Sequence, residues 1–228
     1  LQDMVHTDLV RSITRYARTV REPAMVLQEL DEAVTRAFGQ GGDPGPVYLD
    51  FPVDTLRADV PKAVQLPEHF RPKPRDVLLP EPSRVARAVD LLWNAKRPLV
   101  ISGRGAKGAG DVLCRFLDKL GAVYLDTGES KGLVPEDHPS VVAAMRGAVL
   151  SDADVVITLG RRLDFQLAFG SPAVFGDAKL VRVGDAPGDL RDNRRGEIEL
   201  FADVDATLEA LVAKAGDRPS QVDRAWAG

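Results

Sequence analysis

Residues 99–108 read LVISGRGAKG, an apolar run that passes directly into a glycine-rich turn. The apolar run predicts a buried strand, because a strand covered on both faces is continuously apolar. The turn has the pattern G-x-G-x-x-G starting with Gly103 and Gly105, and an amphipathic stretch over 110–120 predicts a helix after it. Asp126 lies where a dinucleotide-binding fingerprint has its acidic residue. Any tight turn from strand to helix also favours glycine, so NAD binding is only one interpretation of the motif.

A second glycine, Gly160, follows the apolar run at 155–159 and precedes the sequence RRLD at 161–164. In open α/β sheets, ligands bind outside the carboxyl ends of the strands, which is where this loop is predicted to lie. Arg162 offers a planar fork for a phosphate, and Asp164 could hold an arginine or accept a hydrogen bond from a ribose hydroxyl. An exposed loop with an ordinary ion pair would show the same pattern.

The rest of this region alternates in the same way between short apolar runs and helical patterns. Asp185 and Asp203 each follow a predicted strand, although aspartate at such a position is also common as a turn or cap residue. Strands are predicted over 99–101, 122–125, 155–159, 180–183 and 199–201, and helices over 83–95, 110–120 and 204–213. Ser83 is predicted to be the N-cap of the first helix. The alternation predicts a doubly wound parallel α/β domain over 83–216, followed by a tail over 217–228.

The first part of the chain has fewer elements. A helical pattern begins at Pro23 and ends at Gly39, a strand-like run covers 47–51, and residues 11–20 could form another strand. These elements cannot bury a core alone, so residues 1–54 are interpreted as the end of an α/β domain whose beginning is missing. Prolines are dense after it, at Pro52, Pro61, Pro67, Pro72, Pro74, Pro80 and Pro82. This density predicts a linker over 55–82.

The composition excludes several classes of function. The chain has 228 residues, with 30 Lys and Arg against 34 Asp and Glu, so nucleic acid and anionic membranes are not expected as partners. One cysteine, Cys114, excludes a disulfide framework, and its apolar helical surroundings predict a small core residue. The three histidines are scattered, without the spacing of a metal site. A cytoplasmic protein with a small-molecule substrate is expected, and no catalytic or metal-binding residue is assigned.

Four stretches together resemble a known family. They are GPVYLDFPVD at 45–54, RPLVISGRGA at 97–106, SKGLVPEDHP at 130–139 and ADVVITLGRRLD at 153–164. In this order they resemble the thiamine-diphosphate-dependent enzymes of the acetolactate synthase and 2-hydroxyacyl-CoA lyase type. The resemblance implies the end of a pyrimidine-binding domain, a linker and a DHS-like central domain. It also implies a parent that is a homodimer or homotetramer and binds thiamine diphosphate and Mg²⁺ at sites outside this chain.

The resemblance further implies that the central domain binds, or once bound, FAD or ADP. The positions that match the family's nucleotide-binding pattern are Gly103, Gly105, Gly160, Arg162, Asp164, Asp185 and Asp203. The sequence departs from the flavin-binding subgroup at Met145-Arg146-Gly147 and at Phe165-Gln166, where that subgroup has a histidine and a second arginine. These departures put FAD in doubt and bring the chain nearer to the 2-hydroxyacyl-CoA lyase branch.

The expected function is therefore that of a fragment of a carboligase or decarboxylase acting on 2-oxo acids or 2-hydroxyacyl-CoA. The fragment alone is expected to be inactive, because the thiamine cofactor carries the chemistry. Two alternatives remain open from the sequence, namely a free-standing nucleotide-binding module and a non-catalytic structural spacer.

Overall fold

A computed structural model describes residues 4–40, 42–60, 76–142, 144 and 146–226. The chain divides into two compact units, Leu1–Asp76 and Val77–Gly228. Much of the proline-rich stretch, residues 61–75, lies outside the described residues, as does Met145. Among the described residues, no helix is long and apolar enough to cross a membrane.

The first unit contains a two-stranded parallel sheet and one long helix. Its elements are α1 (His6–Val10), η1 (Arg11–Ile13), β1 (Tyr16–Thr19), η2 (Pro23–Met25), α2 (Val26–Ala37), β2 (Val47–Asp50) and α3 (Val53–Arg57). Helix α2 lies against both strands and buries Glu29, which accepts a hydrogen bond from the Tyr16 hydroxyl and lies 3.4 Å from the Arg18 guanidinium. The linker expected over 55–82 thus begins inside a helix, α3.

The second unit is built on a five-stranded sheet in which every neighbouring pair is parallel. Its strands are β3 (Pro98–Ser102), β4 (Val123–Leu125), β5 (Val155–Leu159), β6 (Lys179–Gly184) and β7 (Ile198–Phe201). The strand order is β4-β3-β5-β6-β7, so the chain first moves to one edge of the sheet and then crosses to the other side of β3. The apolar strands are buried because helices cover both faces, as expected for a parallel sheet.

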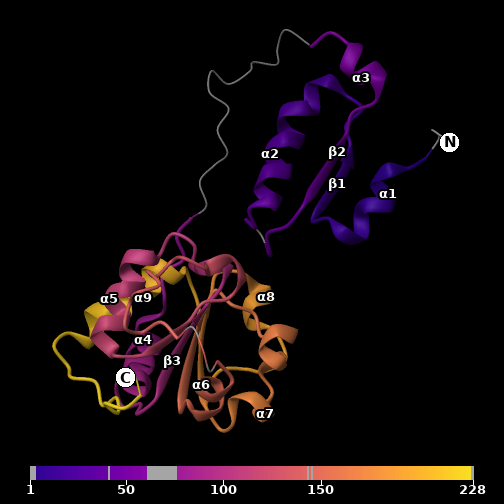
Figure 1. The fold of residues 1–228 in the computed structure, drawn as a ribbon. Coiled ribbons are helices and arrows are strands. Elements are labelled where there is room, and N and C mark those ends of the chain that lie inside the picture. The colour runs from indigo at the N-terminus through magenta and orange to yellow at the C-terminus, as the bar shows by residue number, and fades with distance from the viewer. Residues whose placement is uncertain (1–3, 41, 61–75, 143, 145, 227–228) are drawn as a thin grey trace. The chain divides into compact units, whose positions relative to one another are not determined.

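Three helices cover one face of this sheet and two shorter ones cover the other (Figure 1). The first group is α4 (Pro82–Trp93), α5 (Gly110–Leu120) and α9 (Val204–Ala215), and the second is α6 (Arg146–Asp152) and α7 (Pro172–Phe175). In the first layer Trp93 and Phe116 are fully buried and pack edge to face, with ring centroids 5.9 Å apart. Cys114 is only partly buried at the margin of this layer. The predicted doubly wound α/β fold is confirmed.

The ends of the second unit differ in detail from the sequence prediction. Helix α4 begins at Pro82, and its N-cap is Glu81, so the prediction of a Ser83 cap is wrong. The Glu81 carboxylate accepts hydrogen bonds from the backbone N–H groups of Ser83 and Arg84, which satisfies the first donors of the helix. At the other end, the Trp226 indole donates to the Pro98 carbonyl at 2.9 Å, so this part of the tail packs on the domain.

Candidate active edge of the sheet

The loops after β3 and β5 touch each other through their glycines. The Gly103 N–H donates to the Leu159 carbonyl at 3.0 Å, and the Gly105 N–H donates to the Gly160 carbonyl at 3.1 Å. A Cβ added to Gly160 would lie 2.3 Å from the Gly105 Cα, and Gly160 has a φ of +54°. These three predicted site residues therefore lie together, and their lack of side chains permits a close approach between two loops.

This contact lies where the strand order reverses. Strand β3 pairs with β4 on one side and with β5 on the other, so the connections after β3 and β5 leave in different directions. In doubly wound sheets, ligands bind at the carboxyl ends of the strands at this point. The contact between Gly105 and Gly160 brings backbone atoms of the two loops together at this position.

The loop after β4 is fixed by a cluster of buried hydroxyl groups. The Ser102 hydroxyl lies 2.8 Å from that of Ser130 and 2.5 Å from that of Tyr124, and the Thr127 hydroxyl donates to the Ser102 carbonyl at 2.6 Å. Burial raises the pKa of Tyr124, so this phenol stays protonated in the network. The cluster ties the ends of β3 and β4 together beneath the glycine-rich turn.

Above that cluster, the positive charge of the glycine-rich turn is partly neutralised. The Arg104 guanidinium makes a bidentate ion pair with Glu129, with N–O distances of 2.7 and 2.6 Å. The hydrogen bonds from Arg104 hold the pKa of Glu129 below its usual value. Lys107, two residues beyond Gly105, is exposed and has no ion pair with the residues that the structure describes. Lys107 is therefore the cation of this turn that is available to a ligand.

Two adjacent arginines after Gly160 have different environments. Arg161 is buried and makes a bidentate ion pair with Asp164, at 2.8 and 2.9 Å, together with a hydrogen bond to the Gln166 side chain. The hydrogen bonds from Arg161 hold the pKa of Asp164 below its ordinary value. Arg162 is exposed and makes neither a hydrogen bond nor an ion pair within the described part of the chain. Of the two roles predicted for Asp164, the structure shows the ion pair with an arginine, and the partner is Arg161.

The other two predicted aspartates occupy different places along the edge. Asp185 follows β6 directly, is half-buried and is engaged in an interaction of its own. Asp203 follows β7, the edge strand, and its carboxylate accepts a hydrogen bond from the Leu78 N–H, while the Leu78 carbonyl accepts from the Asp203 N–H. Two strand spacings, about 10 Å, separate the ends of β5 and β7. Asp203 therefore fixes the segment that leads into α4 and stands apart from the glycine contact.

One arrangement at this edge was missed by reasoning from the sequence. Arg182, in the middle of β6, is completely buried and makes an ion pair with Asp192. Asp192 also accepts a hydrogen bond of 2.6 Å from the Leu163 N–H, and Arg182 donates to the Arg194 carbonyl at 2.9 Å. This ion pair joins the loops after β5 and β6. A charged residue inside the apolar run LVRV was the available signal, because arginine is rarely buried without a partner.

The central part of the chain matches a described family. The family model for the thiamine pyrophosphate enzyme, central domain, matches residues 85–211. The chain belongs to the thiamine pyrophosphate enzyme family. The match covers all five strands of the second unit and the loops described above. The resemblance noted in the sequence is confirmed.

Members of this family with known activities align along nearly the whole chain. Mouse 2-hydroxyacyl-CoA lyase 1 is 34% identical over 232 residues, and the alignment covers 99% of this chain and 39% of the mouse protein. Oxalyl-CoA decarboxylase from Escherichia coli K12 is 30% identical, with 98% of this chain and 40% of that protein covered. The chain therefore spans about two fifths of the length of these relatives.

A solved structure shows the same fold. The X-ray structure of a Mycobacterium smegmatis enzyme described as thiamin diphosphate-dependent superposes with a TM-score of 0.72 at 21% sequence identity, covering 92% of this chain and 41% of that one. The family implies thiamine diphosphate together with a metal ion. The described residues bring together no group of three or more His, Cys, Asp or Glu side chains that could hold a metal ion. We therefore assign no step of thiamine chemistry to them.

Proposed function

We propose that this chain supplies the central domain and part of a pyrimidine-binding domain to a longer thiamine-diphosphate-dependent carboligase or decarboxylase. The likeness to a 2-hydroxyacyl-CoA lyase and an oxalyl-CoA decarboxylase supports 2-hydroxyacyl-CoA thioesters or 2-oxo acids as its substrates. Thiamine diphosphate supplies carbanion stabilisation in such enzymes. The longer enzyme is proposed to hold thiamine diphosphate and Mg²⁺ outside this chain and to be a homodimer or homotetramer.

Within that enzyme, the carboxyl edge of the central sheet is proposed to bind an adenine nucleotide, such as ADP or the nucleotide part of FAD or CoA. The observation that carries this proposal is Arg162, an exposed guanidinium without a partner among the described residues, next to the glycine contact at the switch point. A planar guanidinium binds phosphate oxygens in pairs. Lys107 adds a second cation, and Asp185 follows the adjacent strand, where a ribose hydroxyl could donate to it.

The binding proposal is tested by titrating the purified chain with ADP, FAD and NAD in a calorimeter. We expect saturable binding of ADP, and we expect Arg162→Ala to weaken it by about 10- to 100-fold, because a charge-assisted hydrogen bond is worth about 1.5–3 kcal/mol. Arg224→Ala is the matched control, since Arg224 is another exposed arginine without a partner among the described residues. Equal affinities for wild type and Arg162→Ala would contradict this assignment of the phosphate contact.

A structural spacer is the second candidate, and one feature favours it. Gly103, Gly105 and Gly160 are explained by the contact between their loops, and Asp164 and Asp203 are bound by groups of the chain itself. In a structural spacer, these residues would serve only to hold the loops of the domain together. A titration in which none of the three nucleotides binds would support this candidate.

The activity proposal needs the longer enzyme. With thiamine diphosphate and Mg²⁺ added, it should cleave a 2-hydroxyacyl-CoA or decarboxylate a 2-oxo acid, and activity should depend on the thiamine cofactor. Absence of all thiamine-dependent lyase, decarboxylase and carboligase activity would refute the proposal. The nucleotide titration is independent of this outcome, because it uses the 228-residue chain.

A further inference from the structure

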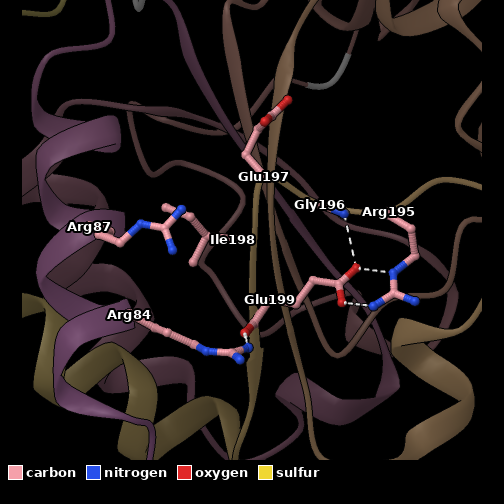
Figure 2. A pocket seen from close by; sticks show the side chains of 7 residues that line it. All are labelled: Arg84, Arg87, Arg195, Gly196, Glu197, Ile198 and Glu199. Atoms are coloured by element: carbon pink, nitrogen blue, oxygen red, sulfur yellow. Dashed lines mark hydrogen bonds and ion pairs between the residues drawn. The ribbon is translucent and has the colours of Figure 1, made fainter.

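A polar pocket of about 420 Å³ lies beside the edge strand β7, away from the loops described above. We call it the β7 pocket. It is lined by Arg84, Arg87, Arg195, Gly196, Glu197, Ile198 and Glu199 (Figure 2). Its residues belong to α4, to the loop over 195–197 and to the start of β7, whereas the predicted nucleotide edge follows the ends of the strands. Its volume is within the range of small-molecule sites.

One ion pair in the pocket is already complete. The Arg195 guanidinium is bidentate on the Glu199 carboxylate, and the Gly196 N–H donates to the same carboxylate at 3.0 Å. These hydrogen bonds, led by those from Arg195, hold the pKa of Glu199 below its ordinary value. The pair contributes no net charge, and Figure 2 shows its hydrogen bonds.

The Arg84 guanidinium uses only some of its donors in contacts with the described residues. Its Nη1 donates to the Glu199 backbone carbonyl at 2.6 Å, which covers a main-chain acceptor on the free edge of the sheet. Its Nε lies 3.9 Å from a Glu81 carboxylate oxygen, and its Nη2 makes no hydrogen bond to the described residues. The Glu81 carboxylate already accepts hydrogen bonds from the first N–H groups of α4. An anion in the pocket would therefore be bound by arginine side chains and not by the N-terminus of the helix.

Arg87 is the arginine of the pocket whose side chain makes no polar contact of its own with the described residues. It lies one turn after Arg84 on α4, so both side chains leave the same face of the helix. It is exposed and has neither a hydrogen bond nor an ion pair with any residue in the described part of the chain. Figure 2 shows both arginines extending toward β7, with the Glu197 carboxylate directed away from them. Both guanidinium groups line the same pocket, so an anion that lies between them is attracted by two positive charges.

We propose that the β7 pocket binds the dianionic phosphate of a small phosphate monoester between Arg84 and Arg87. The tetrahedral oxygens of one phosphate can accept from both planar forks at once, which a single carboxylate group does less completely. The buried side chain of Ile198 offers an apolar contact for the carbon part of the ligand. This inference does not depend on the proposed nucleotide site or on thiamine chemistry.

The test uses glycerol 3-phosphate and inorganic phosphate as probes, each titrated into the full chain and followed by ³¹P NMR line width and calorimetry at low salt. We expect saturable binding of each probe. Arg87→Gln should weaken the binding of both probes by about tenfold or more, because it removes a charged donor that makes no other polar contact with the described residues. Arg224→Gln, a surface control, should leave this binding unchanged.

Two results would overturn the proposal. One is the absence of saturable binding of either probe, and the other is binding that Arg87→Gln does not weaken. If Arg162→Gln weakens phosphate binding and Arg87→Gln does not, the phosphate is held at the nucleotide edge and the β7 pocket is not its site. Unfolding midpoints of the variants should match that of the wild type, since these arginine side chains are exposed.

Discussion

The contact between the two glycine loops makes Gly160→Ala the most informative substitution. The added Cβ would lie 2.3, 2.6 and 2.7 Å from the Cα, C and N atoms of Gly105. All three are backbone atoms, so no flexible side chain can move away, and the two loops must separate. The hydrogen bond from the Gly105 N–H to the Gly160 carbonyl, at 3.1 Å, is strained by the same movement.

The expected cost is the sum of two effects. An alanine held at a φ of +54° costs about 1–2 kcal/mol relative to glycine. Forcing a methyl group into a packed contact costs a further 1–3 kcal/mol or so. We therefore expect Gly160→Ala to lower the free energy of unfolding of the second unit by about 2–5 kcal/mol.

Urea unfolding followed by tryptophan fluorescence measures this directly, because both tryptophans, Trp93 and Trp226, lie in the second unit. Two glycines serve as matched controls, since a Cβ at either Gly108 or Gly147 meets nothing within 4 Å. Gly108→Ala has a φ of +97° and should show only a conformational cost of about 1–2 kcal/mol. Gly147→Ala, inside helix α6, should be neutral or stabilising by about 0.5–1 kcal/mol. A cost for Gly160→Ala no larger than that for Gly108→Ala would refute the contact.

Three further predictions concern buried and titrating groups. Arg182→Met should destabilise the second unit by about 3–5 kcal/mol in urea, because it leaves Asp192 without its buried partner; a loss below 1 kcal/mol would contradict that role. The Arg161 ion pair lowers the pKa of Asp164, so its stabilisation is complete above the ordinary pKa of 3.8 and is lost as the pH falls below it. Asp164→Asn should therefore be less stable than wild type at neutral pH and should approach it in acid, and a gap that is constant with pH would argue otherwise. Burial raises the pKa of Tyr16 to about 12, so its stabilisation is complete below pH 10 and is lost as the pH rises through about 12. Ionisation of Tyr16 should give a step in tyrosine absorbance near pH 12, and this step should be absent from Tyr16→Phe. A step that remains in Tyr16→Phe would show that another tyrosine causes it.

The strands could be predicted because a buried strand is recognised from consecutive residues in the sequence. A parallel sheet covered on both faces needs continuous apolar runs, and β3 and β5 are such runs. The Ser83 cap failed for the opposite reason. Serine is the stronger N-cap by propensity, but the Glu81 carboxylate reaches two N–H groups of the first turn, and Pro82 suits the first helical position.

The site could be predicted in its position but not in its contacts. The sequence places Gly103 and Gly160 at the ends of two strands, yet only the strand order shows that these strands are neighbours and that the glycines meet. Asp203 follows a strand as predicted, but its partner is the Leu78 N–H, 125 residues earlier in the chain. Such distant pairs leave no local pattern in a sequence.

The central claim is that the carboxyl edge of the sheet binds an adenine nucleotide, and chemical-shift mapping with ADP tests it most directly. The measurement uses ¹⁵N-labelled Arg87→Gln protein, so that phosphate binding in the β7 pocket does not contribute. We predict saturable shifts of the backbone amides in 103–108, 160–164 and 185–189, and smaller shifts when Arg162 is also replaced by alanine. Amide shifts that are absent from these three loops at saturating ADP would contradict the claim.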